Sequence, residues 1–151
     1  MSDIITIRMA TIKDSDEIIR LAEQWLNPLY NKDWKEFSLK LTLFELDEYR
    51  LNHIIYIVEE KNKLIGFCDF MVWIDWLTFK RRLIITHVYV DEKHRQEGIG
   101  TALLNKILKD FRPDFTLIDT KPEKFPHAED LYKGLGFTEN PKRKWLEINK
   151  L

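Results

Sequence analysis

The stretch His94-Arg95-Gln96-Glu97-Gly98-Ile99-Gly100-Thr101 decides how this sequence of 151 residues is interpreted. It lies between an apolar run that ends at Val90 and a helical pattern of apolar residues that continues to Phe111. The first turn of a helix has backbone N–H groups without intrahelical partners, and the helix dipole adds partial positive charge there. Glycines let an anion approach these amides, and Arg95 can add a charged contact. The stretch therefore predicts a diphosphate site.

Two other phosphate-binding patterns are excluded by the same residues. In a dinucleotide-binding G-x-G-x-x-G turn the third glycine position would be Leu103, although Asp119 follows at about the distance of the ribose-binding acid. The pattern G-x-x-x-x-G-K-[ST] is absent from the sequence. For the loop taken alone, a second interpretation stays open: the glycines only begin a helix and bind no anion.

On the N-terminal side, residues 5–9 alternate with period two and predict a strand. Asp14 and Glu17 have the spacing of a capping box for a helix that Asn27-Pro28 would end. A second helix is predicted from about residue 33 to residue 44.

Residues 53–58 and 64–74 predict a hairpin joined by a polar turn, and residues 83–90 predict the next strand. The remaining predicted elements are a helix over 98–111, a strand over 115–118, a helix over 126–134 and a strand over 144–148. The order β-α-α-β-β-β-α-β-α-β predicts a single α/β domain over residues 1–151, with a mixed sheet and helices on both faces.

Composition narrows the classes of function. The net charge is −1, and the basic clusters at 80–82 and 142–144 are interpreted as solvated, so neither nucleic acid nor a membrane is an expected partner. The single Cys68 lies in an apolar run, and the four histidines lack metal-ligand spacing, so no metal is expected. The N-terminus has no basic-then-apolar signal, and a cytoplasmic location is expected.

With these elements in place, the sequence resembles the GNAT superfamily of N-acetyltransferases over nearly the whole chain. Residues Arg95–Gly100 match its [QR]-x-x-G-x-[GA] signature, and Val88-Tyr89-Val90 ends a strand before it, as in the family. Residues 128–137 resemble the later motif A-x-x-L/F-Y-x-x-x-G-F, and Ile7-Arg8-Met9-Ala10-Thr11 resembles the family's opening. Three residues before the alanine of this later motif, the family often has an asparagine, and this sequence has Phe125 instead.

The resemblance implies a GNAT-like fold with acetyl-CoA as cosubstrate and direct transfer of an acetyl group to a primary amine. It implies that backbone amides near Val90 pair with the pantetheine arm and that a bulge opens this strand edge. The residues that the resemblance assigns to the cosubstrate are Val88, Tyr89, Val90, Arg95, Gln96, Glu97, Gly98, Ile99, Gly100 and Thr101.

For catalysis, the resemblance places Tyr132 at the position of the general acid, since a phenol with an ordinary pKa of about 10 can protonate a leaving thiolate. A core aromatic is the alternative for this residue. His87 is the candidate base, because histidine ordinarily titrates near neutral pH, but alternation with Val88 leaves open which face it occupies. Asp75 and a chain of water molecules are its competitors.

The acceptor is expected to be an amine of a small molecule or a peptide. Trp25, Tyr30 and Trp34 lie where the family lines its acceptor site, and aromatic faces can hold a cationic amine. A core role is the competing interpretation for them. A catalytically silent acyl-CoA-binding sensor or interaction domain is the alternative function, and a homodimer is compatible with the family.

Overall fold

The computed structural model describes residues 4–30, 53–118 and 128–142, with the side chains of residues 25–30 outside the described part. The chain forms two compact units, residues 1–119 and residues 120–151. Each is described by itself, and the expectation of one domain over 1–151 stays a prediction. No helix in the described ranges is both long and apolar enough to span a bilayer.

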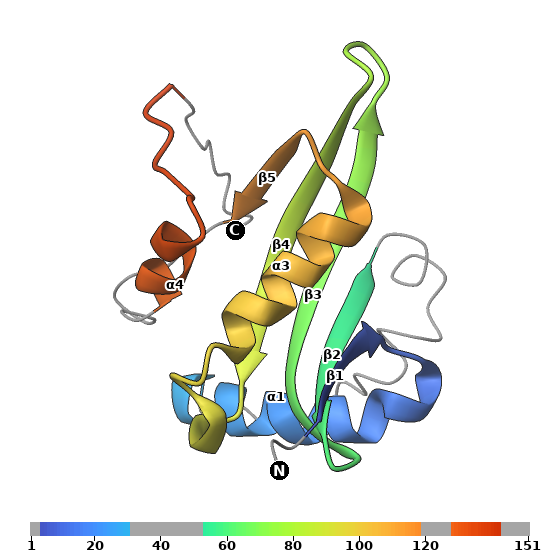
Figure 1. Ribbon diagram of the computed structural model, residues 1–151, viewed down its shortest axis with the longest axis vertical. Coiled ribbons are helices and arrows are strands. Elements are labelled where there is room, and N and C mark those ends of the chain that lie inside the picture. Colours follow the sequence, from blue (N-terminus) through green and yellow to red (C-terminus); the bar gives the residue numbers. More distant parts are fainter. Residues whose placement is uncertain (1–3, 31–52, 119–127, 143–151) are drawn as a thin grey trace, which may run out of the picture. The chain divides into compact units, whose positions relative to one another are not determined.

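The first unit is built on a five-stranded sheet in the order β1-β2-β3-β4-β5 (Figure 1). Its strands are β1 (Ile5–Met9), β2 (Ile54–Glu60), β3 (Lys63–Asp75), β4 (Lys80–Val90) and β5 (Phe115–Ile118). Neighbours from β1 to β4 are antiparallel, and β5 runs parallel to β4 after the crossover through α3. The predicted mixed sheet is confirmed, as is each of its strands over the described residues.

Two helices cover opposite faces of this sheet (Figure 1). Helix α1 (Ser15–Tyr30) packs Leu21 in one cluster with Ile57 of β2. Helix α3 (Ile99–Phe111) meets the other face, where Tyr56, adjacent to Ile57, donates a 2.8 Å hydrogen bond to Asp110. Burial, together with this carboxylate, raises the pKa of Tyr56 to about 12. Helices on both faces are thus confirmed for α1 and α3.

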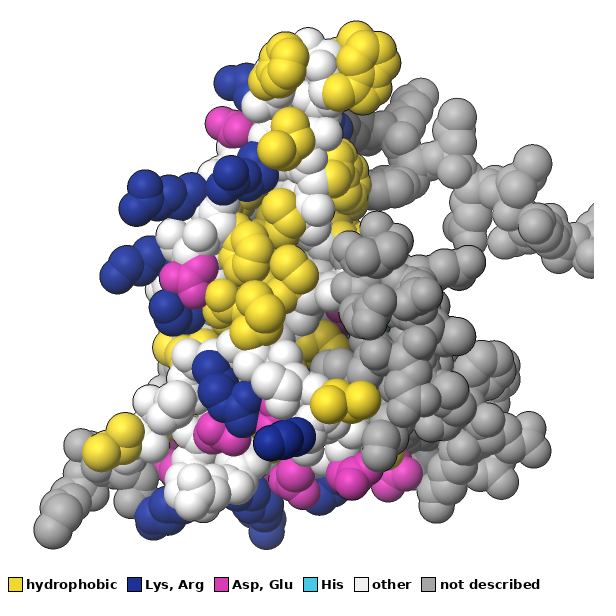
Figure 2. All heavy atoms as spheres, turned by 90° about the vertical axis from the view of Figure 1, so that its right-hand side faces the viewer, with side chains coloured by type: hydrophobic (Ala, Val, Ile, Leu, Met, Phe, Trp, Pro, Cys, Tyr) yellow, Lys and Arg dark blue, Asp and Glu magenta, His cyan; other side chains and the backbone are white. Residues whose placement is uncertain are grey.

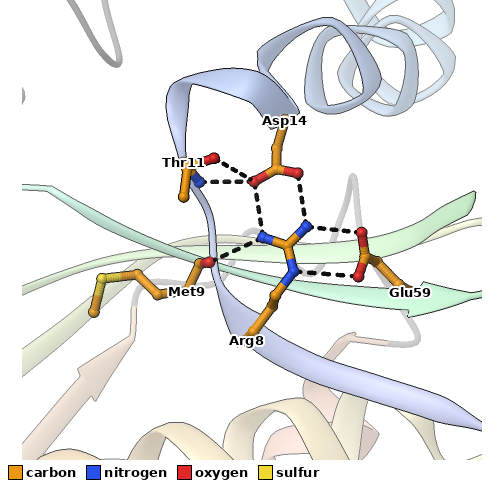
Figure 3. A network of polar contacts seen from close by, with 5 residues as sticks. All are labelled: Arg8, Met9, Thr11, Asp14 and Glu59. Carbon is orange, nitrogen blue, oxygen red and sulfur yellow. Dashed lines mark hydrogen bonds and ion pairs between the residues drawn. The ribbon is translucent and has the colours of Figure 1, made fainter. Parts of the chain in front are cut away.

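The start of α1 differs from the prediction. The carboxylate of Asp14 does not pair with Glu17 as a capping box; it accepts the Thr11 N–H at 2.7 Å, one turn earlier. Thr11 caps the 3₁₀ helix η1 (Ile12–Asp14), and α1 follows at Ser15. The positive charge of Arg8 holds Asp14 in this direction, because Asp14 accepts two hydrogen bonds from its guanidinium, at 2.8 and 2.9 Å (Figure 3).

The predicted end of that helix at Asn27-Pro28 is also wrong, because α1 continues to Tyr30. A proline removes one N–H from the helix and crowds the carbonyl four residues earlier. Helix α1 nevertheless includes Pro28 and reaches Tyr30.

The β3–β4 hairpin carries exposed apolar side chains at its end (Figure 2). They are Trp73, Ile74, Trp76, Leu77 and Phe79. Asp75 stabilises the turn by accepting the Leu77 N–H at 3.0 Å and a 2.9 Å hydrogen bond from Arg82.

The second unit contains α4 (Ala128–Gly134). Tyr132 is buried there and contacts Phe137 edge-to-face, with ring centroids 5.8 Å apart. The helix predicted over 126–134 is confirmed from Ala128 onward. The helix predicted over 33–44 and the strand predicted over 144–148 lie outside the described residues.

Candidate functional site

A β-bulge lies in the middle of β4. Asp69 on β3 pairs with His87, but the next residue, Phe70, pairs with Ile85, so Thr86 is an extra residue on β4. The Thr86 hydroxyl donates a 2.8 Å hydrogen bond to the Asp69 carbonyl. A bulge bends its strand and redirects the side chains around it. The bulge that the resemblance implied is therefore present, immediately before the strand segment that ends at Val90.

Beyond the bulge, β4 directs backbone amides away from β3. The Asp91 N–H donates to the Ile65 carbonyl of β3 at 2.8 Å. Because N–H groups alternate sides along an antiparallel strand, those of Val88 and Val90 face the opposite edge. At that edge β5 pairs with residues 82–85 of β4 only, so no described strand reaches these two amides. This edge segment can pair with an extended ligand arm.

The loop after β4 holds a defined shape. Asp91 is buried, and its carboxylate accepts the Lys93 N–H at 3.0 Å at the start of the 3₁₀ helix η4 (Glu92–His94). His94 lies 3.2 Å from a carboxylate oxygen of Glu60 on β2. The Asp91 carboxylate thus stabilises the loop internally, and the His94 imidazole connects it to β2.

Helix α3 begins at a glycine with a left-handed backbone. Gly98 is the N-cap residue with φ of 78°, and Gln96 has φ of 64°. A glycine has no side chain to cap the helix, and the first intrahelical bond runs from Ala102 N–H to the Gly98 carbonyl at 2.9 Å. The N–H groups of Ile99, Gly100 and Thr101 therefore have no intrahelical partner. They form the helix terminus that favours an anion.

Arg95 lies between the strand edge and the helix terminus. Its Nε donates to the Val90 carbonyl at 3.1 Å, and its guanidinium carbon lies 5.4 Å from the centre of the Tyr89 ring. Burial raises the pKa of Tyr89, so its phenol stays neutral beside this cation. These two contacts keep a permanent positive charge beside the exposed end of β4.

The structure thus brings the ten predicted cosubstrate residues together, from Val88 to Thr101. Some of these residues are buried and others are exposed. Tyr89 and Ile99 are 4% and 3% exposed, so their side chains are not available to a ligand. Gln96, Glu97 and Thr101 are exposed. Their contact with the cosubstrate stays a prediction.

Histidines and a carboxylate meet across the bulge. His87 Nδ1 lies 3.1 Å from Asp69 Oδ2, and His53 Nδ1 lies 2.7 Å from Asp69 Oδ1. His87 shares the Asp69 side of the sheet, away from Val88, whose partner is Cys68. Its side chain is 51% exposed, that of His53 is 17% exposed, and Asp69 is buried. The candidate base thus faces solvent and rests on a buried carboxylate.

Two opposing effects act on Asp69. Burial by itself would raise the pKa of the carboxyl group, but the hydrogen bonds from His87 and His53 outweigh it, and the pKa is lowered. Asp69 is therefore a carboxylate at neutral pH. The neighbouring Cys68 is fully buried, which raises the pKa of its thiol and leaves no nucleophilic thiolate there.

Asp75, the competing base, lies at the far end of β3. It is six residues from Asp69, or about 20 Å along a strand. Its carboxylate is engaged by Arg82 and by the turn amides, with the Leu77 N–H as the main cause of its lowered pKa. It is therefore not placed to act at the bulge.

The other predicted site residues are not gathered there by the described structure. Tyr132 belongs to the second unit, which is described by itself. The side chains of Trp25 and Tyr30, and all of Trp34, lie outside the described part. Within the described ranges, no group of three or more His, Cys, Asp or Glu residues has the arrangement of a metal site.

The sequence matches a known protein family over most of its length. Residues 19–137 match the model of the Acetyltransferase (GNAT) family. The chain belongs to that family.

A curated relative is also similar in sequence. N-acetyltransferase 8 of Homo sapiens is 24% identical over 118 residues, which cover 72% of this chain and 52% of the relative. The chain thus spans about half the length of that curated relative.

Two solved structures are similar over nearly their full length. A possible acetyltransferase from Clostridium difficile 630 has a TM-score of 0.81 at 20% identity, covering 99% of both chains. An aminoglycoside N-acetyltransferase in complex with CoA has a TM-score of 0.76 at 18% identity, covering 99% of this chain and 97% of that one. At these identities the likeness shows the fold of this GNAT member.

Sequence reasoning missed Asp69 and His53. Asp69 stands inside the apolar run from Ile65 to Phe70, where a charged residue must find partners when the strand is buried. An isolated acid in an apolar strand was therefore the sequence feature that could have identified Asp69. His53 lies more than thirty residues from His87 in sequence, and no sequence feature indicated that it contacts the same carboxylate.

Proposed function

We propose that this GNAT member transfers the acetyl group of acetyl-CoA directly to a primary amine. One observation carries the proposal: the outward amides of β4 lead through a fixed loop into the uncapped start of α3. The two parts suit different parts of one ligand. A strand edge suits an extended amide-bearing arm, and a helix terminus suits a diphosphate.

On this proposal, Val88 and Val90 hold the pantetheine arm, and the first amides of α3 hold the diphosphate. Arg95 adds a fixed positive charge beside the anion. The cosubstrate supplies a thioester, whose carbonyl oxygen gains negative charge as the amine attacks. A backbone N–H of the β4 edge is suited to stabilise that oxygen, because it is already oriented and costs no reorganisation.

Two side chains are assigned to proton transfer. His87 takes the proton of the acceptor amine, since it is partly exposed beside the β4 edge and a neutral imidazole has one nitrogen that can accept a proton. Tyr132 is assigned by family resemblance as the acid that protonates the leaving thiolate. Tyr132→Phe keeps the ring contact with Phe137 and removes only the hydroxyl. Turnover by that variant equal to wild type would remove Tyr132 from the mechanism.

The acceptor class is a small-molecule or peptide amine. The aminoglycoside enzyme of similar fold acts on an amine-bearing small molecule. The aromatic residues Trp25, Tyr30 and Trp34 fit a cationic acceptor by the attraction of an ammonium group to a ring face. They are offered as acceptor contacts on the sequence alone.

A panel of polyamines, amino sugars and peptides, assayed for release of free thiol from acetyl-CoA, tests the proposal. We expect at least one amine to give release that depends on its concentration. A silent sensor would instead show thermal stabilisation by acetyl-CoA, of up to about 3 to 4 kcal/mol at high excess, without release. Absence of both responses would reject any role for acetyl-CoA.

A further inference from the structure

We propose that Asp69 is a positioning residue: it fixes the His87 ring with its proton on Nδ1 and its lone pair on Nε2. The inference rests on the proposed function, in which His87 accepts the amine proton. It names the atom that accepts the proton and the buried group that selects it. His53 completes the arrangement as the second partner of the same carboxylate.

The first step is the placement of Asp69. It pairs directly with His87 across β3 and β4, so the two side chains leave the sheet on the same face. The Thr86 hydroxyl holds the Asp69 carbonyl at the bulge, at 2.8 Å. The carboxylate is thereby aimed at the Nδ1 side of the His87 ring, at 3.1 Å.

The second step is the direction of the hydrogen bond. An ionised carboxylate can only accept hydrogen bonds, so the nitrogen facing it must carry a proton. A neutral imidazole has a single N–H, which leaves the other nitrogen as an acceptor. His87 in its neutral form therefore has Nδ1–H toward Asp69 and an unprotonated Nε2. In water the opposite tautomer is favoured, so this state is imposed by Asp69.

The third step is the role of His53. It contacts the second carboxylate oxygen at 2.7 Å, through its own Nδ1. With one imidazole on each oxygen, the Asp69 carboxylate cannot rotate without breaking a hydrogen bond. His53 lies beside β2 on the far side of β3, and its side chain is 17% exposed against 51% for His87. His53 therefore holds the carboxylate, and His87 presents the working nitrogen.

The reaction step that follows is balanced. The amine nitrogen forms a C–N bond with the thioester carbon while the C–S bond breaks. One N–H of the amine breaks and its proton moves to His87 Nε2. The sulfur leaves with the C–S electron pair and takes a proton from Tyr132, the acid assigned above, which regains a proton from solvent. His87 then releases its proton to solvent. Asp69 stays ionised throughout and stabilises the imidazolium.

The test reads the tautomer directly by NMR of the imidazole nitrogens of ¹⁵N-histidine-labelled protein. His53→Gln and His87→Gln assign the signals. In the wild type, at a pH where the His87 ring is neutral, we expect Nδ1 to be protonated and Nε2 to be unprotonated. A protonated Nε2 in the wild type would overturn the proposal, and this readout does not depend on enzymatic activity.

Asp69→Asn gives the second readout. A carboxamide has one acceptor oxygen and an NH₂ donor, so it cannot accept from both rings. We expect the His87 tautomer to shift toward Nε2–H and kcat to fall roughly 100-fold, with the KM for acetyl-CoA unchanged. Asp75→Asn, the same change on the same strand at the hairpin end, should move neither quantity.

The outcomes separate the two proposals. Loss of turnover in His87→Gln with wild-type kcat and tautomer in Asp69→Asn would leave the base in place and reject the role of Asp69. Full turnover in His87→Gln would reject His87 as the base, whatever the tautomer. A shifted tautomer with unchanged kcat would show that Asp69 orients the ring without effect on the reaction, which also overturns the proposal.

Discussion

Two three-residue clusters in the first unit share one arrangement, with a cation at the centre of one and a carboxylate at the centre of the other. Around Arg8, one guanidinium lies between the carboxylates of Asp14 and Glu59, at 2.8 Å from each (Figure 3). Around Asp69, one carboxylate lies between two imidazoles, at 2.7 and 3.1 Å. The Arg8 cluster joins β1 and η1 to β2, and the Asp69 cluster joins the start of β2 to β3 and β4.

The difference lies in which partners can change protonation near neutral pH. An arginine keeps its charge at every pH that a folded protein meets, so the Arg8 cluster can only stabilise the fold. Histidines gain and lose protons near neutral pH, so the Asp69 cluster can take part in chemistry. Cluster geometry alone does not identify a site. The titrating residue type and its exposure do.

The largest effect is expected where the Asp69 cluster meets solvent. His87→Gln removes the base but keeps a polar side chain at a half-exposed position. We expect kcat to fall by roughly 100- to 10,000-fold, the usual contribution of a general base. Steady-state kinetics and a thermal melt of the same sample check this. A matching loss of thermal stability would instead indicate that this cluster, like the first, is structural.

Arg8→Met should have the reverse profile. Two carboxylates would face each other without their cation, and we expect a loss of about 1 to 2 kcal/mol in the free energy of unfolding. The value is held down by solvent screening, because the Arg8 side chain is 38% exposed. Urea titration measures it, with kcat of the folded variant unchanged. Lys106→Met, which breaks a helix-surface pair with Asp110, serves as control and should cost less.

The same cluster predicts a pH dependence with a definite sign. The hydrogen bond from Arg8 holds the pKa of Asp14 below its ordinary value of 3.8, helped by the Thr11 N–H and opposed by burial. A depressed pKa contributes stability above the unfolded value, which is lost as pH falls through the folded value. Wild type should therefore lose stability below about pH 4, and Arg8→Met should show a shallower loss there. Parallel curves would contradict this.

The smallest effect is expected at a backbone position outside both clusters. Gly98→Ala meets no atom within 4 Å, so only the φ of 78° opposes the change. We expect a cost of about 1 kcal/mol and a few-fold rise in the KM for acetyl-CoA. Gly134→Ala, also in open space but inside a helix, should be neutral or slightly stabilising. Equal effects at both glycines would remove the special role of Gly98.

The sequence allowed prediction of what depends on neighbouring residues. Period-two alternation identified the first strand, and β-branched and aromatic runs identified the hairpin strands. The spacing from Arg95 to Gly100 identified the helix start that should bind the diphosphate. The start of α1 was harder to predict, because Asp14 could form a cap either with Glu17 or with Thr11. The hydrogen bonds from Arg8 favour the arrangement with Thr11. The Asp69 cluster depends on strand pairing and on the bulge at Thr86, which no local pattern encodes.

The most direct test of the account is the product balance of one reaction. Wild type and His87→Gln are incubated with acetyl-CoA and the best amine of the panel, and acetylated amine and free thiol are quantified by mass spectrometry. We predict equal amounts of the two products from the wild type and at least 100-fold less of both from the variant. Thiol without acetylated amine, or equal product formation by both proteins, would contradict the account.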